Sequence, residues 1–265
     1  MFPLFRNEMP SSASELEQAL NGSLTRLFSG VTDPVSVRDQ TYPQLSSIDI
    51  ALDGAQLRTN APRPPKLNAN AKPAFDVAEM NISANDICVG PATANLRLRA
   101  ADVQLQQTRD ASGEIVLLLQ RASTGEIEVS ADKAEIENGV AAVARSEAGK
   151  HGVTIDNVKL TIASRGERGV DAEVQLRARK LFFSTTVRIS AKLDLDEQLN
   201  ARLSGLTCNG EGAIGALACG TLQPHIEKMN GRSFSLMALP LGEVRLRDVR
   251  IAAGDRIAVS AEFGA

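Results

Sequence analysis

Strict alternation of apolar and polar residues covers much of the chain and predicts β-strands. It is strongest over residues 170–178 and 187–195, and it continues through 199–203. Similar alternation marks residues 96–105, 127–129, 153–162, 244–251 and 257–263. One polar face per strand is typical of antiparallel sheets that are solvated on one side, because strands buried on both faces show continuous apolar runs. The pattern therefore predicts a large, curved, mostly antiparallel sheet.

A first amphipathic helix is predicted near the start of the chain. Leucines recur there at helical spacing, and Gly30 is expected to end the helix. Ser12 and Ser14 are alternative N-caps, because Glu15 and Glu17 follow each of them at the spacing of a capping box.

Two further helices are predicted in the second half. One follows Asp132 as its expected N-cap and ends at Gly149. The other runs from about Gly212 to Met229, and Pro224 inside it is expected to bend or break it.

The helices are too few to cover both faces of so large a sheet. The predicted fold class is therefore α+β, a large curled mostly antiparallel β-sheet wrapped around two or three amphipathic helices. We expect one elongated domain over residues 1–265, with a tail at 1–13. Residues 61–74 carry four prolines and are expected to form an extended loop or an insertion.

The composition counts against several classes of ligand. Aromatic residues make up only 3% of the chain, with no Trp and one Tyr, so stacking sites for sugars or single-stranded nucleic acid are not expected. The net charge of −3 lacks the basic excess that duplex binding needs. No nucleic-acid partner is predicted, and the oligomeric state stays open.

The sequence also bears on the compartment. No stretch approaches the roughly 20 apolar residues of a membrane span, and residues 1–14 lack the apolar run of a signal peptide. As written, the chain is expected to be soluble and cytoplasmic, or in the cell envelope if its N-terminus was trimmed. Cys208 and Cys219 can pair in an oxidising compartment, but we expect these two and Cys88 to be small buried apolar residues.

One motif with possible chemistry lies at Gly210 to Gly215, which fits G-x-G-x-x-G between a predicted strand and a predicted helix. The strand before it is amphipathic, and no βαβ units surround it, so a nucleotide site is the less favoured interpretation. The preferred interpretation is a glycine-rich entry to a helix. His151 and His225 have no Cys or carboxylate at ligand spacing, and the carboxylates follow solvated strand faces. No metal, cofactor or catalytic residue is predicted.

The predicted helices have many alanines, which would leave a groove between helix and sheet suited to acyl chains. The apolar residues expected to line this groove are Val140, Val143, Ile214, Leu217, Leu222, Ile226, Met229, Leu236 and Leu246. The alternative is that these stripes are plain core.

Basic residues near the C-terminus are candidates for contacts with lipid headgroups. Arg245 and Arg247 share a strand face, whereas Arg250 is out of step unless a bulge intervenes. With Arg177, Arg179 and Lys180 they are expected to form a basic rim. An ordinary solvated face is an equally good interpretation.

The order of these segments resembles a known family. The matching segments are Leu24 to Phe28, Ser47 to Asp49, Phe75 to Val77, Glu128 to Asp132, Val153 to Ile162, the Pro-containing helix, Leu239 to Gly242 and Val244 to Arg247. Together they resemble the bacterial LmeA-like phospholipid-binding family, which is similar to tubular lipid-binding (TULIP) proteins. The resemblance is best over residues 125–265.

The resemblance implies a curled sheet and a long helix that enclose an acyl-chain groove, and no catalytic set. The predicted function is non-enzymatic binding of phospholipid or fatty acyl chains, as a carrier or sensor, with a peripheral membrane surface as a further partner. The alternatives are a protein–protein interaction module with a fully packed core and, less favoured, a nucleotide-binding enzyme using Gly210 to Gly215.

Overall fold

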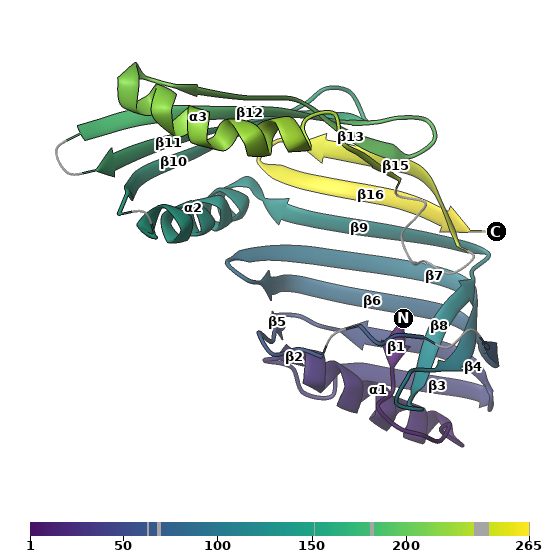
Figure 1. Ribbon diagram of the computed structural model, residues 1–265. Coiled ribbons are helices and arrows are strands. Elements are labelled where there is room, and N and C mark those ends of the chain that lie inside the picture. The colour runs from purple at the N-terminus through teal and green to yellow at the C-terminus, as the bar shows by residue number, and fades with distance from the viewer. Residues whose placement is uncertain (63, 68–69, 151, 181–182, 236–243, 265) are drawn as a thin grey trace.

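Figure 1 shows the computed structural model of the protein, which describes residues 1–62, 64–67, 70–150, 152–180, 183–235 and 244–264. The fold is α+β and mostly antiparallel, as the alternation predicts. It contains two sheets where the sequence predicted one. Among the described strands, the parallel pairs are β4 with β6 and β5 with β6.

The larger sheet has eleven strands. Its main path runs, in spatial order, through β15 (Arg245–Ala253), β16 (Arg256–Gly264), β9 (Thr124–Asp132), β7 (Ala92–Arg109), β6 (Lys72–Val89), β4 (Gln44–Ala51) and β3 (Val35–Thr41). Four strands lie off this path: β1 (Phe2–Pro3), β2 (Phe28–Ser29), β5 (Gln56–Leu57) and β8 (Ile115–Arg121).

The smaller sheet has five strands and lies between β9 and β15 in the sequence. Its order is β10 (Thr154–Ser164), β11 (Gly169–Lys180), β12 (Phe183–Leu195), β13 (Asn200–Gly210) and β14 (Ser233–Ser235). The two sheets meet at the turn between β10 and β11, where the Ile251 amide donates to the Glu167 carbonyl at 2.7 Å. At this junction the two sheets are linked through a turn and do not pair strand against strand. The single sheet that the sequence predicted is therefore two sheets.

Helix α1 (Ala13–Leu27) fills one end of the larger sheet. Ser12 is its N-cap, because the Ser12 hydroxyl accepts a hydrogen bond from the Glu15 amide. Leu16, Leu20 and Leu24 are buried against strands β1, β3, β4, β6 and β8. This end of the molecule therefore has a closed, packed core.

Helix α2 (Lys133–Gly149) covers the β10 edge of the smaller sheet. Ala141 packs there with Ile155 and Val158. Asp132 occupies the N-cap position as predicted but makes no capping hydrogen bond through its side chain. Its carboxylate instead lies 3.8 Å from Arg256 Nε on β16.

Helix α3 (Gly212–Met229) covers β13 and β12 on the same sheet (Figure 1). The helix continues through Pro224, so the expected break is absent. Proline costs a helix one amide donor, and the exposed position of Pro224 leaves water available to the carbonyl that loses its partner. Cys208 on β13 and Cys219 on α3 form a disulfide with a Cα–Cα distance of 5.4 Å, so the prediction of three unpaired cysteines is wrong for this pair.

The Pro-rich segment is shorter than predicted. Strand β6 begins at Lys72 and includes Pro73, whereas we expected residues 61–74 to lie outside the sheet. Pro73 is tolerated because this end of β6 pairs only with β7; pairing with β4 begins at Asp76. Within the described part of residues 61–71, Leu67 forms an isolated bridge with Asp110.

Candidate functional site

The inner face of the larger sheet carries continuous rows of apolar side chains. Leu96, Val129, Val259 and Ile251 are successive register partners across β7, β9, β16 and β15. A second row joins Ile82, Leu98, Ile127 and Ala261. These rows exist because alternation places every second residue of each strand on one face, and register aligns those faces.

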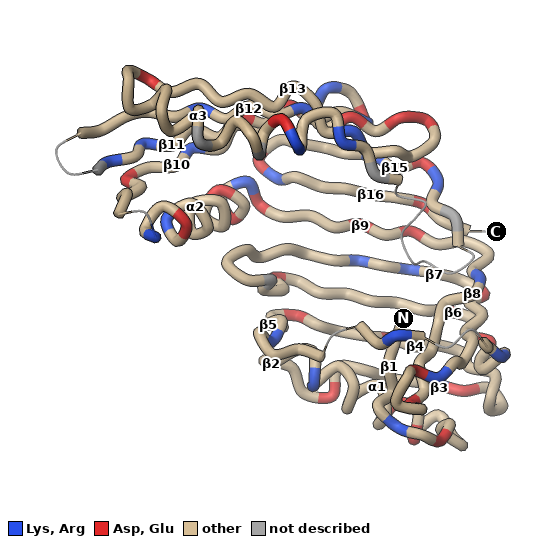
Figure 2. The backbone as a smooth tube through the Cα atoms, in the orientation of Figure 1, with Lys and Arg blue, Asp and Glu red and all other residues tan. Residues whose placement is uncertain are grey.

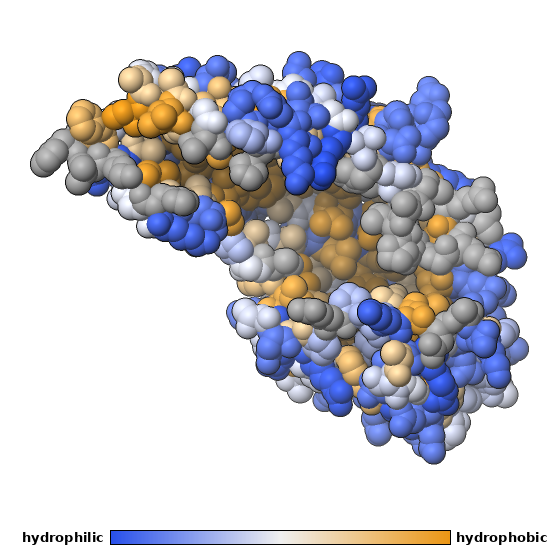
Figure 3. Space-filling view, in the orientation of Figure 1, coloured by the Kyte–Doolittle hydropathy of each residue, from blue (hydrophilic) through white to orange (hydrophobic). Residues whose placement is uncertain are grey.

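A hollow of about 230 Å³ lies on this face. We call it the apolar hollow. Its lining residues are Leu98, Leu119, Ile127, Val129, Val244, Leu246, Val249, Val259, Ser260, Ala261 and Phe263. Val129 and Val259 are 43% and 41% exposed, although their strands, β9 and β16, each have a neighbouring strand on both sides. Figure 3 shows hydrophobic side chains gathered in the hollow between the α2–α3 region and the N-terminal region.

Residues of the smaller sheet pack against two of the residues that line the apolar hollow. Leu195 and Leu199 flank the turn between β12 and β13, and both pack with Val249 and Ala261 of the larger sheet. Asp196 fixes this turn, because its carboxylate accepts hydrogen bonds from the Asn200 amide at 2.8 Å and the Asn200 side chain at 3.0 Å. These hydrogen bonds hold the pKa of Asp196 below its usual value.

The opposite face of the same strands is charged. Arg97 and Arg99 of β7 pair in register with Glu128 and Glu126 of β9, and the Arg99 and Glu126 side chains are 3.9 Å apart (Figure 2). A larger hollow of about 820 Å³ lies on this side, bordered by residues of both charges. Exposed charges of mixed sign are typical of a solvated outer face, so the apolar hollow is the better candidate site.

The residues predicted to line a groove are distributed over several surfaces. Leu246 lines the apolar hollow. Ile226 is buried beneath α3, and Val140 packs in the small core under α2, so both are structural core. Exposed outer positions are taken by Val143, Ile214, Leu217, Leu222 and Met229. Leu236 lies outside the described residues.

The predicted headgroup arginines are placed differently from expectation. Arg247 neighbours Leu246 on β15 and therefore faces the charged side, where its guanidinium donates to the Gly264 carbonyl at 3.1 Å. The Arg245 side chain is outside the described part of the structure. A bulge does intervene between Arg247 and Arg250, where Asp248 has φ +44°, and it brings Arg250 back onto the charged face.

The predicted basic rim does not form around the apolar hollow. Arg177 lies eight residues along β11 from Gly169, roughly 25 Å from the turn that contacts β15. Lys180 also lies at that far end, although its side chain is not described. Arg177 is thus separated from Arg247, so the described members of the predicted rim do not form a ring of positive charge around the apolar hollow.

The glycine-rich motif has a packing role. A Cβ atom on Gly210 would lie 2.2 Å from the Gly215 carbonyl, so only glycine permits this contact between β13 and α3. The Glu211 carbonyl accepts a hydrogen bond from the Thr185 hydroxyl at 2.8 Å. The motif therefore seats the helix directly on the sheet, which accounts for its glycines without a nucleotide.

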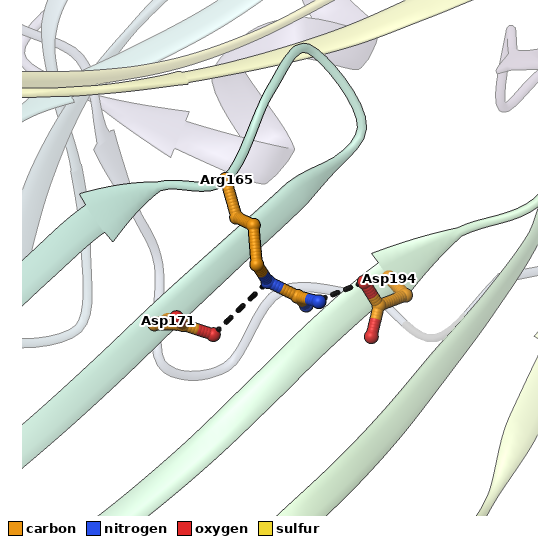
Figure 4. A network of polar contacts seen from close by, with 3 residues as sticks. All are labelled: Arg165, Asp171 and Asp194. Atoms are coloured by element: carbon orange, nitrogen blue, oxygen red, sulfur yellow. Dashed lines mark hydrogen bonds and ion pairs between the residues drawn. The ribbon is translucent and has the colours of Figure 1, made fainter.

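A polar network holds the junction between the sheets (Figure 4). Arg165 Nε lies 3.3 Å from Asp171 Oδ1 on β11, and Arg165 also donates to Asp194 on β12. The network orders the turn whose Glu167 carbonyl accepts from β15. It thereby fixes the smaller sheet against the edge of the larger one.

The described residues also bear on metal binding and on membrane-spanning helices. No cluster of three or more His, Cys, Asp or Glu side chains that could hold a metal occurs among them. Within the same residues, none of the helices has the length and apolarity needed to cross a bilayer. No protein-family model, curated protein or solved structure matches the chain.

The sequence named most residues of the apolar hollow as strand positions but assigned only Leu246 to a site. The sequence feature that could have predicted the hollow is the apolar face of each of the strands β7, β9, β15 and β16. The chain has too few helices to cover them all. That shortage indicates an uncovered sheet face, whereas the predicted groove residues came mainly from the apolar stripes of the helices.

Proposed function

We propose that this protein binds the acyl chains of a phospholipid or fatty acid in the apolar hollow, as a carrier or sensor without enzymatic activity. The observation that carries the proposal is the exposure of Val129 and Val259 on strands that are paired on both sides within a sheet. The apolar face of an inner strand is normally covered by other side chains, because leaving apolar surface in contact with water costs a free energy of roughly 25 cal/mol per Å².

The chemistry of the lining favours hydrocarbon over a polar ligand. Apart from Ser260, every residue that borders the apolar hollow has an aliphatic or aromatic side chain. Its volume of about 230 Å³ exceeds that of apolar cavities of roughly 150 Å³ that stay dry and bind benzene. An acyl chain would fill such a space without leaving a buried polar group unsatisfied.

The shape of the molecule agrees with the family resemblance. The larger sheet curls, with α1 filling one end and the smaller sheet with α2 and α3 overhanging the other (Figure 1). We interpret this arrangement as a variant of the tubular lipid-binding architecture, with two sheets in place of one. The resemblance to LmeA-like proteins supports phospholipid as the ligand class.

The disulfide bears on where this function takes place. Disulfides persist in oxidising compartments and are rare in the cytosol. The Cys208–Cys219 pair therefore favours the cell envelope over the cytoplasm as the site of lipid binding.

The interaction-module alternative is weaker. It requires a fully packed core, whereas Val129 and Val259 remain exposed on the apolar face of the larger sheet. A partner protein could still insert an apolar segment into the same hollow, and the experiment below separates the two.

Native mass spectrometry of the purified protein, followed by organic extraction, tests the proposal. We expect a stoichiometric phospholipid or fatty acid in the wild type and at least a tenfold loss of it in Val259→Asp, because a carboxylate would oppose an acyl chain. Leu57→Asp is the matched control: Leu57 is 42% exposed on β5, away from the hollow, and should retain lipid as the wild type does.

A mass without lipid, together with no uptake from phosphatidylcholine–phosphatidylglycerol vesicles, would overturn the proposal. Equal loss of lipid in both variants would also overturn it, since the ligand would then not occupy the apolar hollow.

A further inference from the structure

The free end of the smaller sheet exposes large apolar side chains. Leu217 is 76% exposed, Phe183 61% and Ile214 41%. Leu217 and Ile214 lie in the first half of α3, and Phe183 begins β12. Single exposed apolar residues are ordinary in proteins. Three large ones at the same end of a sheet and its covering helix form an apolar surface that needs an explanation.

Contacts between β12 and α3 bring these residues together. The Thr185 hydroxyl donates to the Glu211 carbonyl, and the Glu211 amide donates to the Thr186 carbonyl at 2.9 Å. Thr185 is covered by Gly215 on the helix-bearing face. Phe183 is two residues before Thr185, so alternation places it on that same face, just beyond the start of α3.

The charge of this region differs from that of the whole chain. Between Val174 and Leu193 the sequence contains five Lys or Arg residues and no Asp or Glu, although the chain carries a net charge of −3. Helix α3 has no charged residue from Gly212 to Ile226. The end of the sheet is thus apolar on its helix side and basic along its strands (Figure 2).

Neighbouring carboxylates neutralise only part of this positive charge. Arg179 lies 3.4 Å from Asp156, and Arg188 lies 3.6 Å from Glu211. Arg177 is exposed between them on β11. All three arginines lie within five residues of the hairpin end, on the sheet face opposite to Phe183 and α3. At the end of the hairpin, cations on one face therefore lie behind apolar side chains on the other.

We infer that this end of the smaller sheet, which we call the tip surface (Phe183, Ile214, Leu217, Arg177, Arg179 and Arg188), docks onto an anionic phospholipid bilayer. The apolar side chains would enter the boundary between headgroups and acyl chains, and the arginines would lie among the phosphates. A second copy of the chain fits less well, because pairing two tip surfaces would bring basic residues against basic residues.

This inference deepens the proposed function and rests on it for its purpose, since docking would bring the apolar hollow close to its lipid supply. The half-buried apolar face of the smaller sheet, which includes Val174 and Ile189 between α2 and α3, extends from the tip surface toward the larger sheet. Docking and lipid retention are nevertheless separate measurements.

Vesicle flotation tests the inference. We expect wild-type protein to float with vesicles of phosphatidylcholine and phosphatidylglycerol, and to bind pure phosphatidylcholine at least tenfold less. The variants Phe183→Ser and Leu217→Ser should each weaken binding about tenfold, because each removes one inserted apolar side chain. Raising the salt concentration from 0.1 M to 0.5 M should weaken it further, as the Debye length shortens.

Leu57→Ser provides the control, because it removes an exposed apolar residue from β5, away from the tip surface, and should float as the wild type does. Unchanged flotation of both tip variants, or no flotation of the wild type, would overturn the inference. So would a dimer that dissociates on Leu217→Ser, since the tip surface would then be a contact between copies.

The two proposals fail separately. If Val259→Asp loses its bound lipid but floats normally while the tip variants do not float, both proposals stand. If the tip variants float normally and the wild type retains lipid, docking is overturned and lipid binding stands.

Discussion

At the scale of single residues, the turn between β12 and β13 shows how a few side chains join the smaller sheet to the strands of the apolar hollow. Leu199 has φ +58°, a backbone conformation that is unfavourable for a branched apolar residue, yet its side chain is buried against the larger sheet. The carboxylate of Asp196 holds this turn through its hydrogen bonds from Asn200. An exposed aspartate thus helps to hold Leu199 against the larger sheet.

The lowered pKa of Asp196 leads to a prediction about pH. Because the folded state holds this carboxyl at a lower pKa than the unfolded chain does, its stabilising effect is complete above about pH 4 and is lost as the pH falls through the folded value. Asp196→Ala should therefore melt below the wild type at pH 6. The difference in melting temperature should shrink toward pH 3. A difference that stays constant with pH would show that the carboxylate charge is not responsible.

At the scale of elements, helix α3 shows what a sequence pattern can and cannot predict. Its bounds, Gly212 to Met229, follow directly from spacing and from the residues at its ends. The pattern does not predict which of its apolar residues are buried, because Ile226 and Leu217 both lie on the predicted apolar face. Only the position of β13 beneath the helix makes one of them core and leaves the other exposed.

The same limit applies to the strands. Alternation predicts which residues share a face, and the apolar rows of the larger sheet agree with it. Alternation does not reveal partners, so the division into two sheets and the parallel pairing of β4 with β6 could not be foreseen. The disulfide was missed for a related reason, since whether Cys208 and Cys219 meet depends on how α3 folds back onto β13.

The contact between α3 and β13 predicts opposite effects for two similar substitutions. A Cβ atom on Gly215 would lie 2.5 Å from the Gly210 carbonyl carbon, so Gly215→Ala should lower the free energy of unfolding by about 1–3 kcal/mol. Gly220→Ala meets no atom within 4 Å and should raise it by up to about 1 kcal/mol, since alanine favours helix. Urea unfolding measures both. Stabilisation by Gly215→Ala would contradict the close approach of helix and sheet.

At the scale of the whole molecule, the two sheets are joined by few interactions. The Ile251 amide donates to the Glu167 carbonyl, and the Ala253 amide donates to the Ser164 hydroxyl at 2.6 Å. The Arg165 network orders the turn that supplies these acceptors (Figure 4). Besides the contacts of α2 with β7, such as the hydrogen bond from Thr93 to Glu135 at 2.9 Å, the described contacts between the sheets centre on this turn and on Leu195 and Leu199.

This arrangement predicts a local effect of Arg165→Ala. The substitution removes an ion partner from both Asp171 and Asp194, so we expect a loss of about 1 kcal/mol and roughly fivefold faster hydrogen exchange at the Ile251 amide. Arg99→Ala is the matched control, because Arg99 makes only one exposed contact, at 3.9 Å from Glu126. Equal exchange at Ile251 in both variants would show that the network does not secure the junction.

The path of the chain at the edges of the smaller sheet has a mechanical consequence. The chain leaves the larger sheet after Asp132, which pairs with Arg256, and returns at Arg245, which pairs with Gly264. Eight residues of β16 separate these two attachment points, roughly 27 Å along the strand. A segment attached at one point can rotate away from the rest of the molecule. The smaller sheet is attached to the larger sheet at two distant points, which restricts such a rotation. On the proposed function, an acyl chain would therefore enter lengthwise from the side that lacks this attachment, and a long chain would enter more slowly than a short one.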